Sequence, residues 1–537
     1  MREDAIKLAD SSKVVTRSSL AFLSGTFISR FTGLGRDMSM AFCFGSHPAI
    51  AAFMVAFRFA NLIRRLFGEG PLSSGFIPYF EGIRKESPVR GAQFFRDLFI
   101  SLTVFLCFFI GVTEVALIAL WKWGQFTVEN REILYLSILM LPGIVFICLF
   151  GLSSGLLQCE RKFFLTGLAP VAFNVVWIAA AWWFKDRAPS EAMAYLSGAV
   201  VIAFLMQWAM VAPHTVRFLR HFLSWKECVS AQLFSKEMRQ VLKPFLLGVI
   251  GVSAVQINSA LDAVFARAAS LEGPAYLWYA IRLQQLPLAL FGIALSAALL
   301  PSLSRMVKDH LEEYNRLMNF AFRRSFSLIF PCTIGIFVLG ASAVNLIYGR
   351  GDFSNEATYQ TVICLFGYGI GLVPSVLLLL LAPSFYSKKN YATPMRGSLY
   401  AVILNALLSA FFVFSLEWGA FSIAVATSVS AWVNYLYLSY HSCSIWDKEL
   451  TRSCVKTTGA TLIAGAVTLM IGAMILDDPT YGILKGGEGV VFARAFFVQF
   501  LQFLGLVGTF SLVLLSCAWM LKAQDLLSLV GLENKRS

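Results

Sequence analysis

Arginine side chains occur inside stretches of this sequence that are otherwise apolar enough to form membrane helices. An arginine at the bilayer centre costs about 2.5 to 3.5 kcal/mol on insertion scales, so such residues normally face a protein or water-filled interior. Guanidinium groups bind phosphate oxygens through paired hydrogen bonds, which suits a pyrophosphate. Several arginines in one membrane region therefore predict an anionic ligand. The residues are Arg30, Arg36, Arg58, Arg64, Arg65 and Arg282.

The region 57–70 places polar residues at helical spacing. Arg58, Asn61, Arg65 and Glu69 are separated by three, four and four residues, so they share one face of a helix, and Arg64 lies beside it. One glutamate cannot neutralise these arginines, which favours contact with a ligand. One alternative is a structural network in which these charges neutralise each other. The other is that Arg64 and Arg65 snorkel to the bilayer surface.

The first apolar run carries Ser29 and Arg30, then two glycines, then Arg36 and Asp37. The glycines permit a bend that would free backbone groups to line a cavity. Adjacent residues on a helix do not face each other, so we do not expect Arg36 to pair with Asp37. Much later in the chain, Arg282 has no acidic neighbour, and this also favours a ligand-binding role.

A second group of polar residues is consistent with a cation site. Asp262 lies within an apolar run, and buried carboxylates in transporters bind cations or protons. Asn405 and Ser409 are four residues apart in a later run, and Thr427 and Ser430 are three apart in the next. Such residues serve helix packing more often than ion binding, so packing is the alternative.

These residues must be positioned by membrane helices. The chain has 537 residues, of which 58% are hydrophobic and 14% charged. Soluble domains carry about 25% charged residues, so the composition predicts an all-α polytopic membrane protein. Apolar runs of sufficient length predict about fourteen spans. Their limits are 15–44, 50–80, 94–121, 132–157, 164–184, 191–213, 241–268, 275–303, 319–348, 359–386, 395–416, 418–441, 455–476 and 493–521.

The connections between these spans alternate in charge. Lysine and arginine gather after the even-numbered spans, for example at Arg84, Lys85 and Arg90. The positive-inside rule then places both termini in the cytoplasm. The same asymmetry explains the net charge of +13, so nucleic-acid binding is not predicted.

A repeat relates the two halves of the chain. Ala56-Phe57-Arg58 matches Ala280-Ile281-Arg282, and each is followed by a proline and a basic loop, at an offset of roughly 225 residues. The repeat predicts two six-helix lobes, 1–225 and 226–450, with a cavity between them. Two additional helices and a cytoplasmic tail occupy 451–537.

No enzymatic constellation is found. The sequence contains no nucleotide-binding GxxxxGK[ST] motif, no HExxH and no GxSxG, and its ten cysteines form no CxxC pair. We therefore predict a transporter without a cofactor, driven by the substrate gradient, the membrane potential or coupled Na⁺ or H⁺.

Several motifs resemble one family. They are SRFTGLGRD (29–37), FRFANLIRRLFGEG (57–70), FIPYF (76–80), LLPSLSRM (299–306), YGRGDFS (348–354) and SFYSKKNYATP (384–394). The chain is similar here to the MurJ/MviN family, the lipid II flippase branch of the multidrug/oligosaccharidyl-lipid/polysaccharide exporter superfamily.

The resemblance implies fourteen helices, a V-shaped cavity and a groove for a polyprenyl tail beside the last two helices. It implies functional arginines at Arg30, Arg36, Arg64 and Arg282, and a sodium site at Asp262, Asn405 and Thr427. The substrate would be lipid II, the undecaprenyl-pyrophosphate-linked disaccharide peptide of peptidoglycan, flipped outward across the bacterial inner membrane. Cell-wall synthesis proteins are predicted as further partners.

The chain lacks acidic residues that the family pattern has. Members commonly have aspartate where this chain has Ala51 and Ile281, and a carboxylate can stand where it has Ser409. The cavity is therefore expected to be unusually positive. The alternatives to a lipid II flippase are an exporter of another polyprenyl-linked oligosaccharide and a membrane enzyme acting on lipid-linked sugars.

Overall fold

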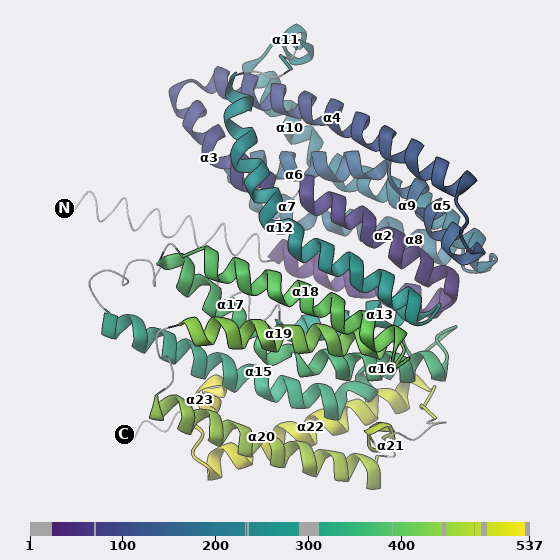
Figure 1. Ribbon diagram of the computed structural model, residues 1–537, viewed down its shortest axis with the longest axis vertical. Coiled ribbons are helices and arrows are strands. Elements are labelled where there is room, and N and C mark those ends of the chain that lie inside the picture. The colour runs from purple at the N-terminus through teal and green to yellow at the C-terminus, as the bar shows by residue number, and fades with distance from the viewer. Residues whose placement is uncertain are drawn as a thin grey trace. The chain divides into compact units, whose positions relative to one another are not determined.

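The protein, described from a computed structural model, is built of helices (Figure 1). The structure describes residues 24–68, 71–230, 232–233, 236–288, 311–388, 390–442, 447–476, 478–484 and 491–531, with some side chains of α3, α11, α12, α15 and the short 3₁₀ turn left out. Within these ranges there is no β-strand. The predicted all-α class is confirmed.

Local sequence signals begin many of the helices. Proline stands in the first turn of α2 (Pro48–Phe67), α4 (Pro88–Trp123) and α9 (Pro189–Ala209), where its missing N–H leaves no hydrogen bond unmade. Elsewhere a side chain caps the first turn: Ser354 accepts from the amide of Ala357 at the start of α16 (Asn355–Ile370).

The predicted spans match helices of the structure. Among described residues, nine helices are long and apolar enough to cross a membrane, or ten if the pair Val128–Met140 and Gly143–Cys159, bent by 49°, counts as one span. These ten correspond to the third to sixth and the ninth to fourteenth predicted spans. The other four fall on helices that adjoin or include residues outside the description.

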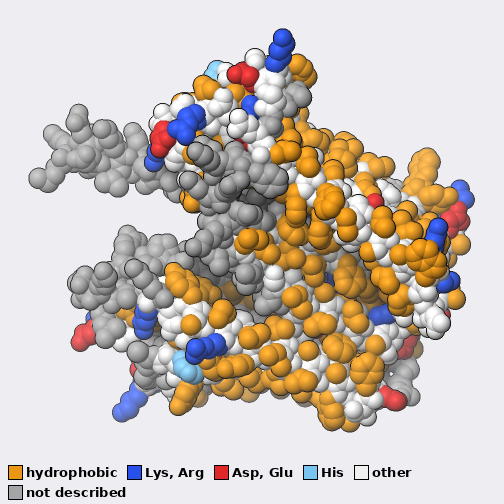
Figure 2. All heavy atoms as spheres, turned by 45° about the horizontal axis from the view of Figure 1, so that its top comes forward, with side chains coloured by type: hydrophobic (Ala, Val, Ile, Leu, Met, Phe, Trp, Pro, Cys, Tyr) orange, Lys and Arg blue, Asp and Glu red, His pale blue; other side chains and the backbone are white. Residues whose placement is uncertain are grey.

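The surface supports a membrane environment. Large apolar side chains are exposed along several spans, among them Phe108 at 70%, Val115 at 69% and Trp183 at 83%. Figure 2 shows apolar side chains spread widely over the visible surface of the described helices. In water such patches would be unfavourable, whereas lipid acyl chains solvate them well. The protein is a multi-pass membrane protein.

The contacts divide the chain into two compact units, Met1–Ala263 and Val264–Ser537, and the division falls inside α12. The predicted limits at 225 and 450 stay a prediction, as does the V-shape. Unit 1 contains the helix 24–44, α2, α3 (Pro71–Glu86), α4, α5 (Val128–Met140), α6 (Gly143–Cys159), α7 (Phe163–Leu168), α8 (Pro170–Trp183), α9, α10 (Ala212–Phe222), α11 (Trp225–Val229) and most of α12 (Lys236–Ala269).

Unit 1 is packed largely by aromatic rings. Phe76 and Phe80 of α3 stack at 5.1 Å, and they contact Phe94 and Phe95 of α4 in a core that α6 completes. A second aromatic group joins α2 to α8, with Trp177 in edge-to-face contact with the rings of α2. Aromatic pairs of this geometry stabilise beyond their buried area.

Unit 2 holds the remaining helices: α13 (Gly273–Pro287), α15 (Leu311–Tyr348), α16, α17 (Leu372–Ser387), α18 (Ala392–Phe414), α19 (Phe421–His441), α20 (Lys448–Met474), α21 (Thr480–Leu484), α22 (Phe496–Met520), α23 (Gln524–Leu527) and a 3₁₀ turn (Ser528–Val530). The last two long helices, α20 and α22, pack against each other and against α15. Buried Gln499 of α22 donates to Asn345 of α15 and to the carbonyl of Ala493, which ties this pair to the unit.

The same order of helix pairing recurs in both units. In unit 1, α2 packs on α5, α5 packs on α9, and α8 packs on α9. In unit 2 the corresponding pairs are α13 with α16, α16 with α19, and α18 with α19. Each unit therefore repeats the contacts expected if spans seven to twelve copy spans one to six, which agrees with the sequence repeat.

Candidate functional site

Arg36 is buried and fully engaged by its own unit. It is 7% exposed, its Nη2 lies 2.8 Å from Oδ1 of Asp37, and its Nε donates to the same oxygen at 3.1 Å. The expectation that these neighbours do not pair is wrong. Their Cβ atoms do diverge, but the long arginine side chain folds back along the helix, and burial removes water as a competing partner.

Asn174 of α8 completes this cluster. Its Oδ1 accepts from Arg36 at 3.3 Å, while its Nδ2 donates to the carbonyl of Ser29 at 3.2 Å and to Thr32 Oγ1 at 3.0 Å. The guanidinium also lies 4.8 Å from the ring centre of Trp177, a distance typical of a cation–π contact. The sequence analysis missed Asn174, although a lone asparagine within an apolar run was a signal.

Arg30 lies in a different environment on the same helix, 24–44. Its side chain is exposed and makes no hydrogen bond or ion pair with any described residue. Ser29 beside it contributes its carbonyl to Asn174 and Thr32, so its main chain has a packing role. The first helix thus presents one arginine to the interior and another to the exterior of unit 1.

The polar residues of α2 have the predicted helical spacing. The helix runs unbroken to Phe67, so Arg58, Asn61 and Arg65 share a face. Arg58 and Asn61 are half-buried and Arg65 is exposed. Arg58 Nη1 lies 3.4 Å from the carbonyl oxygen of Ser259 in α12, a long contact that leaves most of its donors available.

Two further positions from the sequence analysis, Arg64 and Ala51, lie on α2. Arg64 is half-buried, and Ala51 belongs to the apolar core with no exposed surface. Glu69 lies outside the described residues. The Ala51 position is therefore a packing position here, and an aspartate there would need a partner.

Arg282 lies on α13 in unit 2. It is half-buried, and its guanidinium carbon is 4.4 Å from the ring centre of Trp278, one helical turn earlier. Gln284 on the same helix donates to the carbonyl of Tyr368 in α16 at 3.2 Å, which fixes α13 against its neighbour. The contact between Trp278 and Arg282 has the geometry of a cation–π interaction.

The residues of the predicted sodium site lie in both units. Asp262 of α12 is 7% exposed, and Asn405 and Ser409 are buried on α18. The hydroxyl of Thr427 on α19 donates to the carbonyl of Ile423, a bond within its own helix. Within the described residues no group of three or more His, Cys, Asp or Glu could hold a metal ion. The sodium site stays a prediction.

A second neighbouring pair, Arg96 and Asp97 at the start of α4, was not predicted. Arg96 Nη2 lies 2.6 Å from Asp97 Oδ1, and Nη1 donates to the carbonyl of Glu227 at 2.8 Å. The Asp97 carboxylate also accepts from the amide of Gln232 at 3.1 Å. The segment after α10 is therefore fastened to α4. Hydrogen bonds from Ser224 lower the pKa of Glu227 in the same segment.

Comparison with known proteins identifies the family. The model of the lipid II flippase MurJ family matches residues 40–481 of this chain. The chain belongs to the MurJ family. A probable lipid II flippase MurJ of Chlamydia pneumoniae is 32% identical over 98% of this chain and 96% of its own length. One of Vibrio cholerae serotype O1 is 30% identical over 86% of this chain and 89% of its own.

Solved structures share the fold of this MurJ family member. A lipid II flippase MurJ in an inward closed conformation has a TM-score of 0.73 and 22% identity, covering 94% of this chain and all of its own. An inward-facing MATE family multidrug transporter of the MOP superfamily follows with a TM-score of 0.62 and 13% identity, over 81% of this chain and 99% of its own. At these identities the likeness concerns the fold alone.

Proposed function

We propose that this protein is a lipid II flippase of the bacterial inner membrane, with both termini in the cytoplasm. It moves the polyprenyl-pyrophosphate-linked peptidoglycan precursor from the inner to the outer leaflet and catalyses no covalent reaction. The observation that carries the proposal is membership of the MurJ family across residues 40–481. The arginines on the membrane helices of both units add the chemistry that an anionic head group requires.

We propose different roles for the arginines from the contacts that they make. Arg30 is exposed, and Arg58 makes one long hydrogen bond to Ser259, so these two have donors for phosphate oxygens. Arg65 is exposed on the same face of α2 as Arg58. Asn61, on the same face, supplies a neutral donor. Arg36 is committed to Asp37 and Asn174, so it acts as a positioning residue that holds helix 24–44 on α8. Arg64 and Arg282 complete the proposed set.

Alternating access then follows from differential affinity. In this proposal a bound pyrophosphate supplies the negative charge that guanidinium groups attract. A ligand shifts a conformational equilibrium only by the difference between its affinities for the two states. We therefore propose that lipid II binds the closed arrangement of these side chains more tightly than the open one, which favours passage to the outward-open state.

The test uses a strain depleted of its own flippase and rescued by this chain. Lipid II exposed on the outer leaflet is the readout. We expect Arg30→Ala and Arg58→Ala together to abolish exposure, because each removed guanidinium loses charge-assisted bonds of about 1.5 to 3 kcal/mol to the pyrophosphate. Membrane insertion of the variant is expected to be normal.

The matched control is Arg131→Ala, which removes an exposed arginine near the start of α5 whose side chain makes no hydrogen bond or ion pair with a described residue. It should rescue the strain fully. Full rescue by the Arg30/Arg58 variant would refute the assignment of these arginines. Failure of the unaltered chain to expose lipid II would refute the flippase proposal itself.

We propose cation coupling as a separate property. Asp262, Asn405 and Thr427 provide oxygen donors, which suit a hard ion such as Na⁺. The buried Ser409 hydroxyl, one turn from Asn405, makes no hydrogen bond to a described residue and is available as another ligand. Asp262→Asn should remove any dependence of lipid II exposure on external sodium, measured across a sodium series. An unchanged sodium response in this variant would exclude the site.

A further inference from the structure

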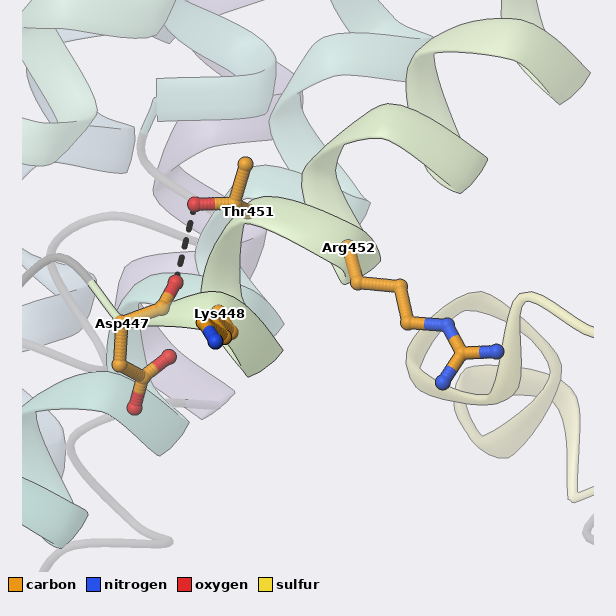
Figure 3. Close-up of a pocket in the computed structure, with 4 residues that line it drawn as sticks. All are labelled: Asp447, Lys448, Thr451 and Arg452. Carbon is orange, nitrogen blue, oxygen red and sulfur yellow. Dashed lines mark hydrogen bonds between the residues drawn. The ribbon is translucent and has the colours of Figure 1, made fainter.

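The cytoplasm-facing end predicted for α20 carries an open pocket of about 680 Å³. Asp447, Lys448, Thr451 and Arg452 line it (Figure 3). Lys448 and Arg452 are four residues apart, so their side chains leave the same face of α20 on consecutive turns. Lys456 extends this basic row by one more turn. The pocket therefore concentrates positive charge at the start of the helix.

The acidic residues of this segment are already engaged. The Asp447 carboxylate accepts from the amide of Leu450 at 2.6 Å and from Nδ2 of Asn319 in α15 at 2.5 Å. Glu449 is paired with Arg323 of the same α15. Both carboxylates thus fasten α20 to α15, and the negative charge that Asp447 keeps is outnumbered by the positive charges of Lys448 and Arg452.

The basic pair has no such partner. Both side chains are exposed, and neither makes a hydrogen bond or an ion pair with a described residue. In Figure 3, Arg452 extends away from the hydrogen bond that Thr451 donates to the carbonyl of Asp447. Together the two cations offer up to eight N–H donors to a ligand that approaches the pocket.

The position of the pocket along α20 identifies the kind of anion. The helix has 27 residues. At about 1.5 Å per residue it is roughly 40 Å long, which exceeds the hydrocarbon core of about 30 Å, so its first two turns lie at the level of the lipid head groups. Further along α20, on the same face, the side chain of Val455 is 65% exposed, that of Leu462 50% and that of Met470 59%. This apolar stripe continues from the basic pair into the acyl region.

We propose that this pocket binds the phosphate of an anionic phospholipid, with Lys448 and Arg452 on the head group and the acyl chains along the apolar stripe. A soluble anion would use only the charges, whereas a phospholipid uses both parts of the surface. Basic residues at a membrane surface attract anionic lipids in this way. The site is distinct from the arginines assigned to lipid II and does not depend on that assignment.

The experiment measures lipid binding to the purified full-length protein in detergent by native mass spectrometry. Phosphatidylglycerol is titrated against the unaltered chain and the double variant Lys448→Gln/Arg452→Gln. Each basic side chain near an anionic surface contributes about fivefold to binding, so the double variant should bind about 25-fold more weakly. Phosphatidylcholine, which has no net charge, should bind both proteins alike.

Three controls make the result decisive. Lys185→Gln/Arg187→Gln removes the same charge at the other predicted side of the membrane and should leave phosphatidylglycerol binding unchanged. The charge-conserving swap Lys448→Arg/Arg452→Lys should retain it, which separates charge from folding. Inorganic phosphate should not displace the lipid. Equal binding by the Gln variant, equal loss in the 185/187 control, or displacement by inorganic phosphate would each overturn the proposal.

Discussion

The paired residues Arg36 and Asp37 show that two arginines of one helix can differ in their contacts. The pair is buried, and Asn174 joins it to the backbone of the same helix through Ser29. Arg30, six residues earlier, makes no comparable contact with a described residue. The two arginines belong to one sequence motif but lie in different environments, because Arg36 contacts α8 and Arg30 is exposed.

Asn174→Leu should reduce stability without changing the charge of the protein. The variant removes three hydrogen bonds and leaves one buried Arg36 donor without its partner, while the Ser29 carbonyl keeps its bond from Thr32. Each such buried group costs about 1 to 3 kcal/mol, so a clear fall in the melting temperature of the detergent-solubilised protein is expected. Asn130→Leu, at an exposed asparagine of α5, is the matched control and should melt normally. If the two variants had the same melting temperature, Asn174 would not have this structural role.

At the scale of elements, the spans were predictable because the bilayer imposes a simple requirement: about 20 apolar residues in one helix. The sequence therefore located the nine helices, or ten with the bent pair, that are long and apolar enough to span a membrane among the described residues. The 49° break between Met140 and Gly143 was not predicted, although Pro142 lies within it. Proline kinks some helices and only ends others, and tertiary packing decides which.

The side-chain pairings were harder to predict than the spans. Arg36 bonds to Asn174 across 138 residues of sequence, and Arg96 to Glu227 across 131. Helical periodicity identifies which residues share a face, but it does not identify the residue that another helix places opposite. The spacing of Arg58, Asn61 and Arg65 was therefore predicted correctly, while the partner of Arg36 was not.

The buried Arg96–Asp97 pair is expected to control the segment that follows α10. Asp97→Ala leaves Arg96 buried without its carboxylate and releases the amide of Gln232. Breaking a buried pair costs about 3 to 5 kcal/mol, so the segment should detach from α4. The measurement is the rate of tryptic cleavage after Lys226, which should rise in this variant.

An exposed pair provides the comparison for that variant. Arg187 and Glu191 lie 3.4 Å apart, and both side chains are largely exposed. Exposed pairs contribute about 0 to 1 kcal/mol, so Glu191→Ala should leave cleavage after Lys226 unchanged. If Asp97→Ala also left the rate unchanged, the attachment would depend on other contacts.

At the scale of the whole molecule, two units repeat one order of helix pairing and each has its own buried polar centre. Asn174 bonds across unit 1, and Gln499 bonds across unit 2 to Asn345 and Ala493. The two centres share no partner. The position of the repeat was visible in the sequence, whereas these centres depend on single polar residues within apolar runs.

Independent centres predict additive losses. The fall in melting temperature of Asn174→Leu combined with Gln499→Leu should equal the sum of the falls of the single variants, since sites without shared partners add within about 0.5 kcal/mol. If the double variant had the same melting temperature as the less stable single variant, one unit would determine the stability of both.

The two neighbouring Arg–Asp pairs also bear on how the chain enters the membrane during synthesis. Arginine and aspartate each cost about 2.5 to 3.5 kcal/mol at the centre of an inserting helix. At positions 36–37 and 96–97 the opposite charges are adjacent in sequence, and each arginine bonds directly to its neighbour. Such a pair can neutralise itself as it leaves the ribosome, before any other helix is available. The translocation machinery then receives a nearly neutral dipeptide, and the distant partners Asn174 and Glu227 join it only after folding.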